Sequence, residues 1–389
     1  MAFKYFPLQI RKPSLFFYKL ADKKFPVQSG YLLMINPLRF HTLRQMILQI
    51  SPGQSLARKA CHKDGWQPAQ GFLPANLIKL ALINAVDLNA RTVTLTGASP
   101  FAHPDFTRLA AWITRVAPPA QCFTLEVEAA LDDLTTASIA CLADLAQAGF
   151  PCRVMIGVEQ RAPGSRRPVA SPPSIAAARL LAAAGVETQV VYHVYQSRFK
   201  QVDEMIHLGE DLGAAKIIFL PRPFARSSAG STGLTVAEWS ALGRRLEREC
   251  APYTRLSVLI DQPPAFLGLS PQFVIQPANQ CSPIQSLTVL SSGEISMCGS
   301  TAHLPELILG RLGVDDLKCV WESHPLLEHL RQTLPHGLEG VCGQCSLKSV
   351  CMGYCPAETY ARTGSFTQPY WFCDAAHKSG LFPAGRISA

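Results

Sequence analysis

Three successive stretches decide the fold class of this 389-residue chain: Cys152-Arg-Val-Met-Ile-Gly-Val158, Pro173–Ala184 and Glu187-Thr-Gln-Val-Val-Tyr-His-Val194. The two outer runs are short and rich in Val and Ile, as buried strands are. Apolar residues between them recur three or four apart, as on one face of a helix. A strand, a helix and a second strand in this order predict parallel strands joined by a right-handed crossover.

The same alternation extends over about residues 44–260. Strands are predicted at Met46–Ser51, Thr92–Thr96, Cys122–Glu126, Cys152–Val158, Glu187–Val194 and Lys216–Leu220. Helices are predicted after them, at Pro74–Leu88, Pro104–Val116, Leu134–Ala148, Pro173–Ala184, Gln201–Leu212 and Thr235–Cys250. Six such units are fewer than the eight of a closed barrel. The expected fold is therefore α/β, either an open, curved barrel or a doubly wound sheet, with ligands bound at the carboxyl ends of the strands.

Composition and charge exclude several classes of protein. Hydrophobic residues make up 48% of the chain and charged residues 16%, which is too apolar for a disordered protein. The net charge of +8 favours acidic partners weakly, and the short basic groups are not interleaved with aromatic residues, so we expect no nucleic-acid site. We recognise no signal peptide and no apolar run of about 18 residues, and expect a cytoplasmic protein without a membrane span.

Seven of the thirteen cysteines follow a regular spacing in the C-terminal third. They are Cys281, Cys298, Cys342, Cys345, Cys351, Cys355 and Cys373. Thiolates two residues apart can bind one metal centre, and soft thiolates select zinc or iron–sulfur centres. Seven ligands exceed one tetrahedral zinc site, although two zinc sites remain an alternative. Structural disulfides are not expected in a reducing compartment.

The cysteine spacing resembles that of the SPASM domain, the auxiliary-cluster module of many radical S-adenosylmethionine (SAM) enzymes. The signature of that domain is C-x(9–15)-G-x4-C, a gap, C-x2-C-x5-C-x3-C, a second gap and a last C. Leu309-Gly-Arg-Leu-Gly313 resembles its connector. The resemblance implies two iron–sulfur clusters of the 4Fe-4S type. The outer cluster would be held by Cys342, Cys345, Cys351 and Cys373. The inner cluster would be held by Cys281, Cys298 and Cys355, with an open iron site or a borrowed fourth ligand. Cys319 is expected to be a core thiol.

Residues 44–260 resemble the radical SAM barrel, in which C-x3-C-x2-C after the first strand holds the cluster that binds and cleaves SAM. The matching loop here is Ser51-Pro-Gly-Gln-Ser-Leu-Ala-Arg-Lys-Ala-Cys61. Gln54 and Arg58 occupy the first two cysteine positions, and only Cys61 remains. A guanidinium has no lone pair to offer a metal at neutral pH, so a three-cysteine site cannot form in this loop.

A second motif departs from the family in the same direction. The family's G-G-E-P, which contacts SAM, corresponds here to Thr96-Gly-Ala-Ser-Pro100. Gly97 and Ser99 are therefore the candidate cofactor-binding positions, but Ser99 lacks the carboxylate that would face the ammonium group of SAM. SAM is thus a doubtful cofactor. His103, which follows in Phe101-Ala-His-Pro-Asp105, is expected to have a structural role.

These observations predict four regions: an N-terminal extension (1–43), a partial (βα)6 TIM-like barrel (44–260), a linker (261–280) and a small cysteine-rich, SPASM-like iron–sulfur domain (281–389). The main hypothesis is an accessory subunit that binds a peptide or protein substrate, or relays electrons to an active radical SAM enzyme. One alternative is an active radical SAM peptide-modifying enzyme with unusual cluster ligation. The other is a structural zinc-binding scaffold. No catalytic residue is predicted.

Overall fold

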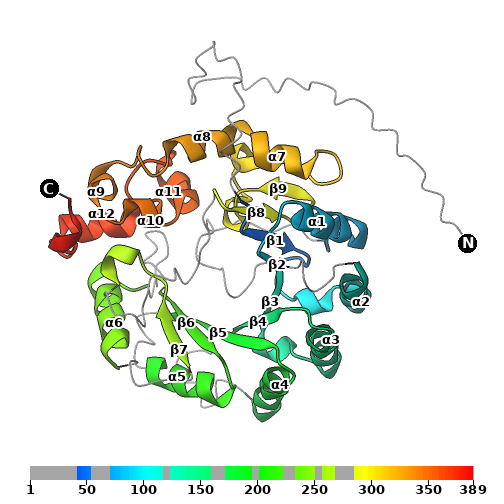
Figure 1. Ribbon diagram of the computed structural model, residues 1–389. Coiled ribbons are helices and arrows are strands. Elements are labelled where there is room, and N and C mark those ends of the chain that lie inside the picture. The colour runs from blue at the N-terminus through cyan, green and yellow to red at the C-terminus, as the bar shows by residue number, and fades with distance from the viewer. Residues whose placement is uncertain are drawn as a thin grey trace, which may run out of the picture. The chain divides into compact units, whose positions relative to one another are not determined.

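A computed structural model describes residues 42–53, 71–116, 123–158, 171–194, 201–221, 233–249, 256–267 and 284–388 (Figure 1). All of them belong to one compact unit, His41–Ala389, and the predicted N-terminal extension 1–43 lies almost wholly outside the described ranges. Among the described residues, no helix is both long and apolar enough to cross a bilayer.

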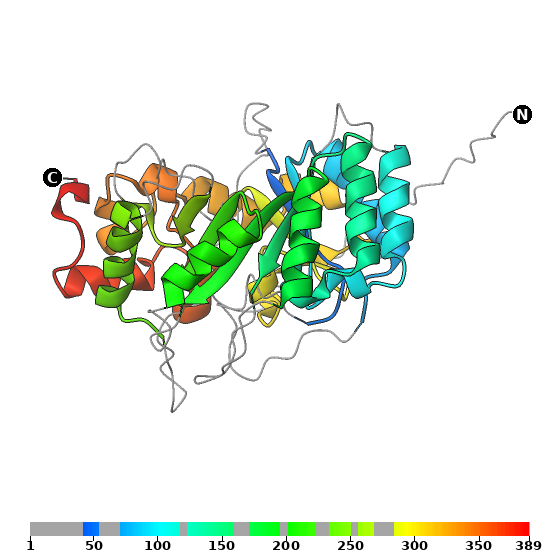
Figure 2. The same ribbon diagram turned by 90° about the horizontal axis from the view of Figure 1, so that it is seen from below.

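A single ten-stranded sheet organises the compact unit, in the order β10-β9-β8-β1-β2-β3-β4-β5-β6-β7 (Figures 1 and 2). Neighbouring strands from β1 to β7 are parallel, and β8 pairs parallel to β1, with Gln45 aligned to both Thr92 and Ser286. β9 and β10 add an antiparallel edge. The strands are β1 Gln45–Gln49, β2 Thr92–Thr96, β3 Thr124–Ala130, β4 Cys152–Gly157, β5 Glu187–Val194, β6 Lys216–Pro221, β7 Ser257–Ile260, β8 Ser286–Val289, β9 Glu294–Ser296 and β10 Ile308–Arg311.

Helices α1 to α6 alternate with the strands and lie around the outside of the curved sheet (Figure 1). They are α1 Ala75–Asp87, α2 Phe106–Val116, α3 Thr136–Gln147, α4 Pro172–Ala183, α5 Val202–Asp211 and α6 Val236–Glu249. Local signals fix their starts. The hydroxyl of Thr135 accepts a hydrogen bond from the Ser138 N–H at 3.2 Å and caps α3, and α4 starts with Pro172 directly after the capping residue Ser171.

The C-terminal part consists of short helices. They are α7 Leu317–Ser323, α8 Pro325–Thr333, α9 Gly340–Gln344, α10 Lys348–Cys351, α11 Pro356–Thr363 and α12 Trp371–Lys378. Six 3-10 turns occur in the described ranges: η2 Pro100–Ala102, η4 Leu131–Asp133, η6 Pro264–Phe266, η8 Gly299–Thr301, η9 Pro305–Leu307 and η10 Ala384–Arg386.

The α/β class and the six predicted strand–helix units are confirmed, and β2 and β5 have the predicted bounds. Because the helices cover only the outer side, the sheet forms an open, curved barrel and not a doubly wound sheet (Figure 1). Two strands that pair parallel to their neighbours, β7 and β8, were not predicted. Each has only four residues, too few for a periodic pattern to stand out.

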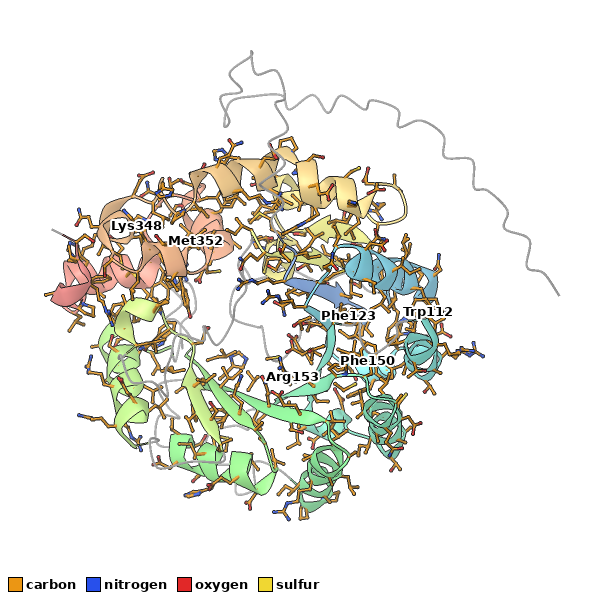
Figure 3. All side chains as sticks on the ribbon, in the orientation of Figure 1. Trp112, Phe123, Phe150, Arg153, Lys348 and Met352 are labelled. Atoms are coloured by element: carbon orange, nitrogen blue, oxygen red, sulfur yellow. The ribbon has the colours of Figure 1, made fainter. Side chains whose placement is uncertain are left out.

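The inner face of the sheet is divided into a polar and an apolar half. The polar half is a hydrogen-bonded ladder that starts at Gln45, passes through Thr94 to Glu126, and continues through Arg153 to Glu187. Arg153 points into the barrel (Figure 3) and neutralises two carboxylates there. The apolar half is a cluster of five buried side chains from β4 to β7: Met155, Val191, Ile218, Leu220 and Leu259.

The main core lies between the sheet and the outer helices. Phe123 and Phe150, just before β3 and β4, make an edge-to-face contact there, with ring centroids 5.6 Å apart (Figure 3). This core continues without a break into the C-terminal part, where it includes Trp321 and Phe372. The predicted linker 261–280 is described only as far as Leu267, and the start of the predicted cysteine-rich domain, Cys281, lies outside the described residues. The three predicted boundaries between the four regions therefore stay predictions.

Candidate metal centre

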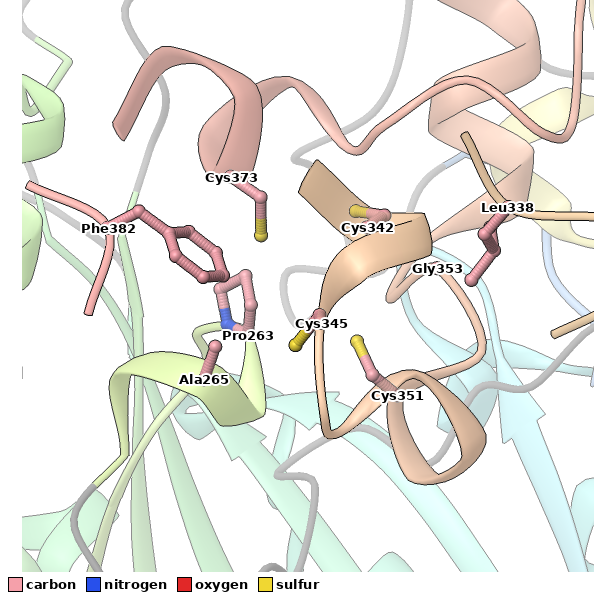
Figure 4. Close-up of a pocket in the computed structure, with 9 residues that line it drawn as sticks. All are labelled: Pro263, Ala265, Leu338, Cys342, Cys345, Cys351, Gly353, Cys373 and Phe382. Carbon is pink, nitrogen blue, oxygen red and sulfur yellow. The ribbon is translucent and has the colours of Figure 1, made fainter. Parts of the chain in front are cut away.

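Four of the seven predicted ligands point into one cavity (Figure 4). Cys342 belongs to α9, Cys345 follows that helix, Cys351 ends α10, and Cys373 lies in the first half of α12. None of these four cysteines forms a disulfide. The cavity encloses about 300 Å³, part of it open to solvent, and its other walls are Pro263, Ala265, Leu338, Gly353 and Phe382. These four cysteines are those predicted for the outer cluster.

A tight reversal of the chain separates the outer ligands from the predicted inner ones. Met352, Gly353 and Tyr354 have φ angles of 54°, 81° and 62°, three left-handed residues in succession. Such a run turns the chain back on itself, so that Cys351 faces the cavity and Cys355 caps the start of α11. Gly353 suits this turn for two reasons: its φ of 81° is one that side chains rarely adopt, and a Cβ there would lie 3.0 Å from Leu338 Cδ2, which would have to shift.

The four thiols influence one another electrostatically. A hydrogen bond with Cys373 lowers the pKa of Cys342 against the opposing effect of burial, and the Tyr370 N–H adds to the lowering. The same hydrogen bond, together with burial, raises the pKa of Cys373 well above its usual value. Burial, followed by the charges of Cys342 and Cys345, raises the pKa of Cys351 to about 12. A metal centre binds thiolates, so its insertion here must release protons.

The spacing of the ligands and the hydrogen bonds to their sulfur atoms bear on which metal group the cysteines fit. A tetrahedral zinc ion needs its sulfur ligands about 4 Å apart around one point. Among the residues that the structure describes, no three His, Cys, Asp or Glu side chains converge closely enough to hold one metal ion. An iron–sulfur cluster instead lets each thiolate bind a separate iron. Backbone N–H groups of Tyr370 and Leu347 point at the sulfurs of Cys342 and Cys345, both at 3.4 Å, as is favourable for thiolate ligands. Four thiols lining one cavity fit an iron–sulfur cluster, and a tetrahedral zinc ion stays an alternative for the same donors.

Two of the three predicted inner ligands lie on neighbouring elements. Cys298 directly precedes η8, and Cys355 caps α11, which packs against η8. The Cys355 sulfur accepts a hydrogen bond from the Glu358 N–H at 3.4 Å. Cys281, the third, lies outside the described residues, so the inner ligand set remains a prediction.

A hydrogen bond that was not predicted from the sequence joins the cysteine turn to the barrel. The Tyr354 hydroxyl donates to Asp261 Oδ1 at 2.5 Å, and Asp261 directly follows β7. Burial and the Asp261 charge raise the pKa of Tyr354 well above its usual value, so the phenol remains a donor. The residues after Asp261 supply Pro263 and Ala265 to the cavity wall, so the cavity is built jointly by the barrel and the cysteine-rich segment. The signal that could have identified Asp261 is its place as an acidic residue at the carboxyl end of a parallel strand. That strand, β7, was not predicted.

The substitution Tyr354→Phe tests this link. We expect it to lower the free energy of unfolding by about 1–3 kcal/mol, since it leaves a partly buried carboxylate without its phenol donor. Asp261→Asn, which keeps an acceptor oxygen, should cost less. Urea unfolding followed by circular dichroism gives both values, and a double-mutant cycle gives the coupling between the two side chains. A coupling of zero would show that the contact contributes nothing.

The predicted cofactor-binding positions lie in a closely packed pair of loops after β1 and β2. Gly97 has φ +131°, and a Cβ on it would overlap Ser51 Oγ and the Ser51 carbonyl oxygen. The next two amides are both occupied: Ala98 N–H donates to the Pro52 carbonyl at 3.1 Å, and Ser99 N–H donates to Ser51 Oγ at 3.2 Å. Gln54, Arg58 and Cys61 lie outside the described residues.

Two further expectations have opposite outcomes. His103 has the structural role expected of it. Its Nδ1 accepts from the Asp105 N–H at 3.1 Å, so Nε2 carries the proton and donates to the Leu73 carbonyl at 2.9 Å, which ties the start of α2 to the start of α1.

The expectation that Cys319 is a core thiol is wrong. Its side chain is exposed because it lies on the solvent side of α7, whose buried residues are Leu317, Val320 and Trp321.

Comparisons with known proteins support the fold. No family model and no curated protein sequence matches the chain. The structure of SuiB from Streptococcus suis bound to its precursor peptide SuiA superposes with a TM-score of 0.63 at 12% identity, covering 86% of this chain and 76% of SuiB. The structure of anSMEcpe with bound SAM superposes with a TM-score of 0.60 at 14% identity, covering 86% of this chain and 91% of anSMEcpe. This chain has the fold of radical SAM enzymes. At such identities the likeness establishes the fold alone.

Proposed function

We propose that this protein is an iron–sulfur protein of the radical SAM/SPASM type that does not cleave SAM and acts as an accessory subunit in the modification of a peptide or protein. One observation carries the proposal. Four thiols gather in the C-terminal cavity, whereas Gln54 and Arg58 stand at two of the three cysteine positions in the sequence of the loop after β1.

The outer site would hold a cluster through Cys342, Cys345, Cys351 and Cys373, and such a cluster supplies one-electron transfer. Four thiolate ligands leave no iron open to a substrate. Leu338 and Phe382 form apolar walls, and the amides of Tyr370 and Leu347 hold the sulfur atoms in position. These residues suit a relay and give no group that could activate a substrate.

The loops after β1 and β2 argue against SAM cleavage in this chain. In the sequence, two of the three ligand positions of the radical cluster are Gln54 and Arg58. A second reason is the acidic position of the G-G-E-P motif, which is Ser99 here and offers no carboxylate to the ammonium group of SAM.

The peptide or protein partner is proposed from the fold neighbours. SuiB was crystallised with its precursor peptide SuiA, and anSMEcpe with SAM and the Cp18Cys peptide. An accessory protein of the same fold could present such a peptide to an active radical SAM enzyme or exchange electrons with that enzyme. We infer both partners by analogy of fold.

Anaerobic purification and reconstitution test the proposal against its two alternatives. We expect about eight irons and eight sulfides per chain, and no 5′-deoxyadenosine when SAM and dithionite are added. Formation of 5′-deoxyadenosine would instead identify an active radical SAM enzyme. About two zinc ions per chain without sulfide would identify a structural zinc scaffold.

A further inference from the structure

The outer cysteine cavity comes close to solvent at one edge. Segment 344–346 pairs with segment 386–388, through hydrogen bonds from the Ser346 N–H to the Arg386 carbonyl and from the Ser388 N–H to the Gln344 carbonyl, both at 2.8 Å. Cys345 lies within this pair, and its neighbours Gln344 and Ser346 are exposed. We call these two segments, together with Ser346–Val350, the Cys345 edge. Electron tunnelling weakens steeply with distance, so an edge at which a cavity cysteine has exposed neighbours on both sides suits a docked partner.

Two cations flank this edge. Lys348 Nζ donates to the Gly343 carbonyl at 2.8 Å, and Arg386 Nη2 donates to the Leu267 carbonyl at 3.4 Å. Both charges act on Cys345. Within the described residues neither cation has a carboxylate in ion-pair distance. Other cations of the cysteine-rich segment are paired, Arg362 with Glu358 at 2.8 Å and Lys378 with Asp374 at 2.6 Å.

An exposed apolar side chain lies on the same short helix as Lys348. Val350 is 54% exposed on α10, one residue before the cavity residue Cys351. Lys348 starts that helix and is half-buried. A segment that combines an exposed apolar residue with cations that have no acidic partner suits a surface that attracts an acidic protein and then excludes water from the contact.

We propose that the Cys345 edge is the docking surface for an acidic one-electron carrier protein of the ferredoxin class. The inference rests on the proposed function, because it needs a cluster in the outer site. One electron passes from the reduced carrier, which is oxidised, to the outer centre, which is reduced, and no bond or proton moves in the transfer. Lys348 and Arg386 steer the carrier, and Val350 contacts it.

Stopped-flow reduction of the reconstituted protein tests the proposal. The electron donor is a reduced plant-type [2Fe–2S] ferredoxin, and the bleaching of the cluster absorbance is followed. We expect the double variant Lys348→Glu/Arg386→Glu to lower the second-order rate constant about tenfold or more at low ionic strength. Added salt should slow the unaltered protein and reduce this difference. Lys318→Glu, an exposed charge reversal on α7 in the same segment, should leave the rate unchanged.

Dithionite, a small reductant that needs no docking surface, separates the possible failures. It should reduce all three proteins equally. If dithionite finds no cluster in the unaltered protein, the proposed function itself fails. If clusters form and the ferredoxin rate does not depend on Lys348, Arg386 or salt, the docking surface is wrong. An equal loss in Lys318→Glu would show an effect of net charge and also overturn the proposal. A loss seen only when an active radical SAM enzyme is the partner would assign the surface to that enzyme.

Discussion

Replacing Cys351 with serine should remove about half of the iron and sulfide from the anaerobically reconstituted protein. Cys351 lines the cavity with three other thiols, and burial raises its pKa to about 12. Such a thiol is inert unless a metal displaces its proton, and its place among three other thiols in one cavity favours the role of a ligand. Serine offers a harder oxygen donor that binds iron of this kind poorly. The outer cluster should be lost while the inner one is retained.

The exposed Cys319 provides the matched control for this prediction. It lies in the same segment, but on the solvent side of α7 and away from the cavity. Cys319→Ser should therefore retain the full iron and sulfide content. Iron analysis with the absorbance near 400 nm measures both variants. Full iron content in Cys351→Ser would refute the assignment of the outer site.

Replacing Gly97 with alanine should destabilise the protein by on the order of 3 kcal/mol or more. The position has two independent requirements. Its φ of +131° is a conformation that side chains rarely adopt, and a Cβ would overlap the backbone oxygen of Ser51 as well as its hydroxyl. A backbone clash cannot be relieved by a change of rotamer, so the loops after β1 and β2 must move apart.

Gly185 separates the two requirements. It also has a positive φ, +82°, but a Cβ there would meet nothing within 4 Å. Gly185→Ala should cost only about 1 kcal/mol, the price of the backbone conformation. Urea unfolding of both variants measures the difference. Equal losses would mean that the overlap with Ser51 is absorbed without strain.

Most of the fold follows from the sequence because each strand and helix carries its own periodic pattern. The predicted strand Glu187–Val194 matches β5 residue by residue, and Pro173–Ala184 differs from α4 by one residue at each end. The strand Cys122–Glu126 was placed too early, since β3 runs from Thr124 to Ala130 through Glu126 and Glu128. Those carboxylates interrupted the apolar pattern, although they face the polar half of the barrel interior and accept hydrogen bonds from Thr94 and Thr96.

The candidate site could be predicted only in part. Spacing identified the cysteines, because ligands close in sequence around one centre leave a regular pattern. The walls of the cavity left no such pattern. Pro263 and Ala265 come from the loop after β7, and Phe382 comes from the chain beyond α12. Long-range packing alone brings these residues to the cysteines. The Tyr354–Asp261 hydrogen bond spans 93 positions for the same reason.

The pairing of β8 with β1 has a consequence for the newly made chain. Gln45 aligns with Ser286, so its partner on that side is synthesised 241 residues later (286 − 45). At about 5–20 residues per second, the ribosome needs roughly 12 to 48 s to make that stretch. During this time β1 exposes an unsatisfied edge, which other strands could join. Chains that stop before residue 286 should therefore aggregate, and this protein should depend on chaperones while it is being translated.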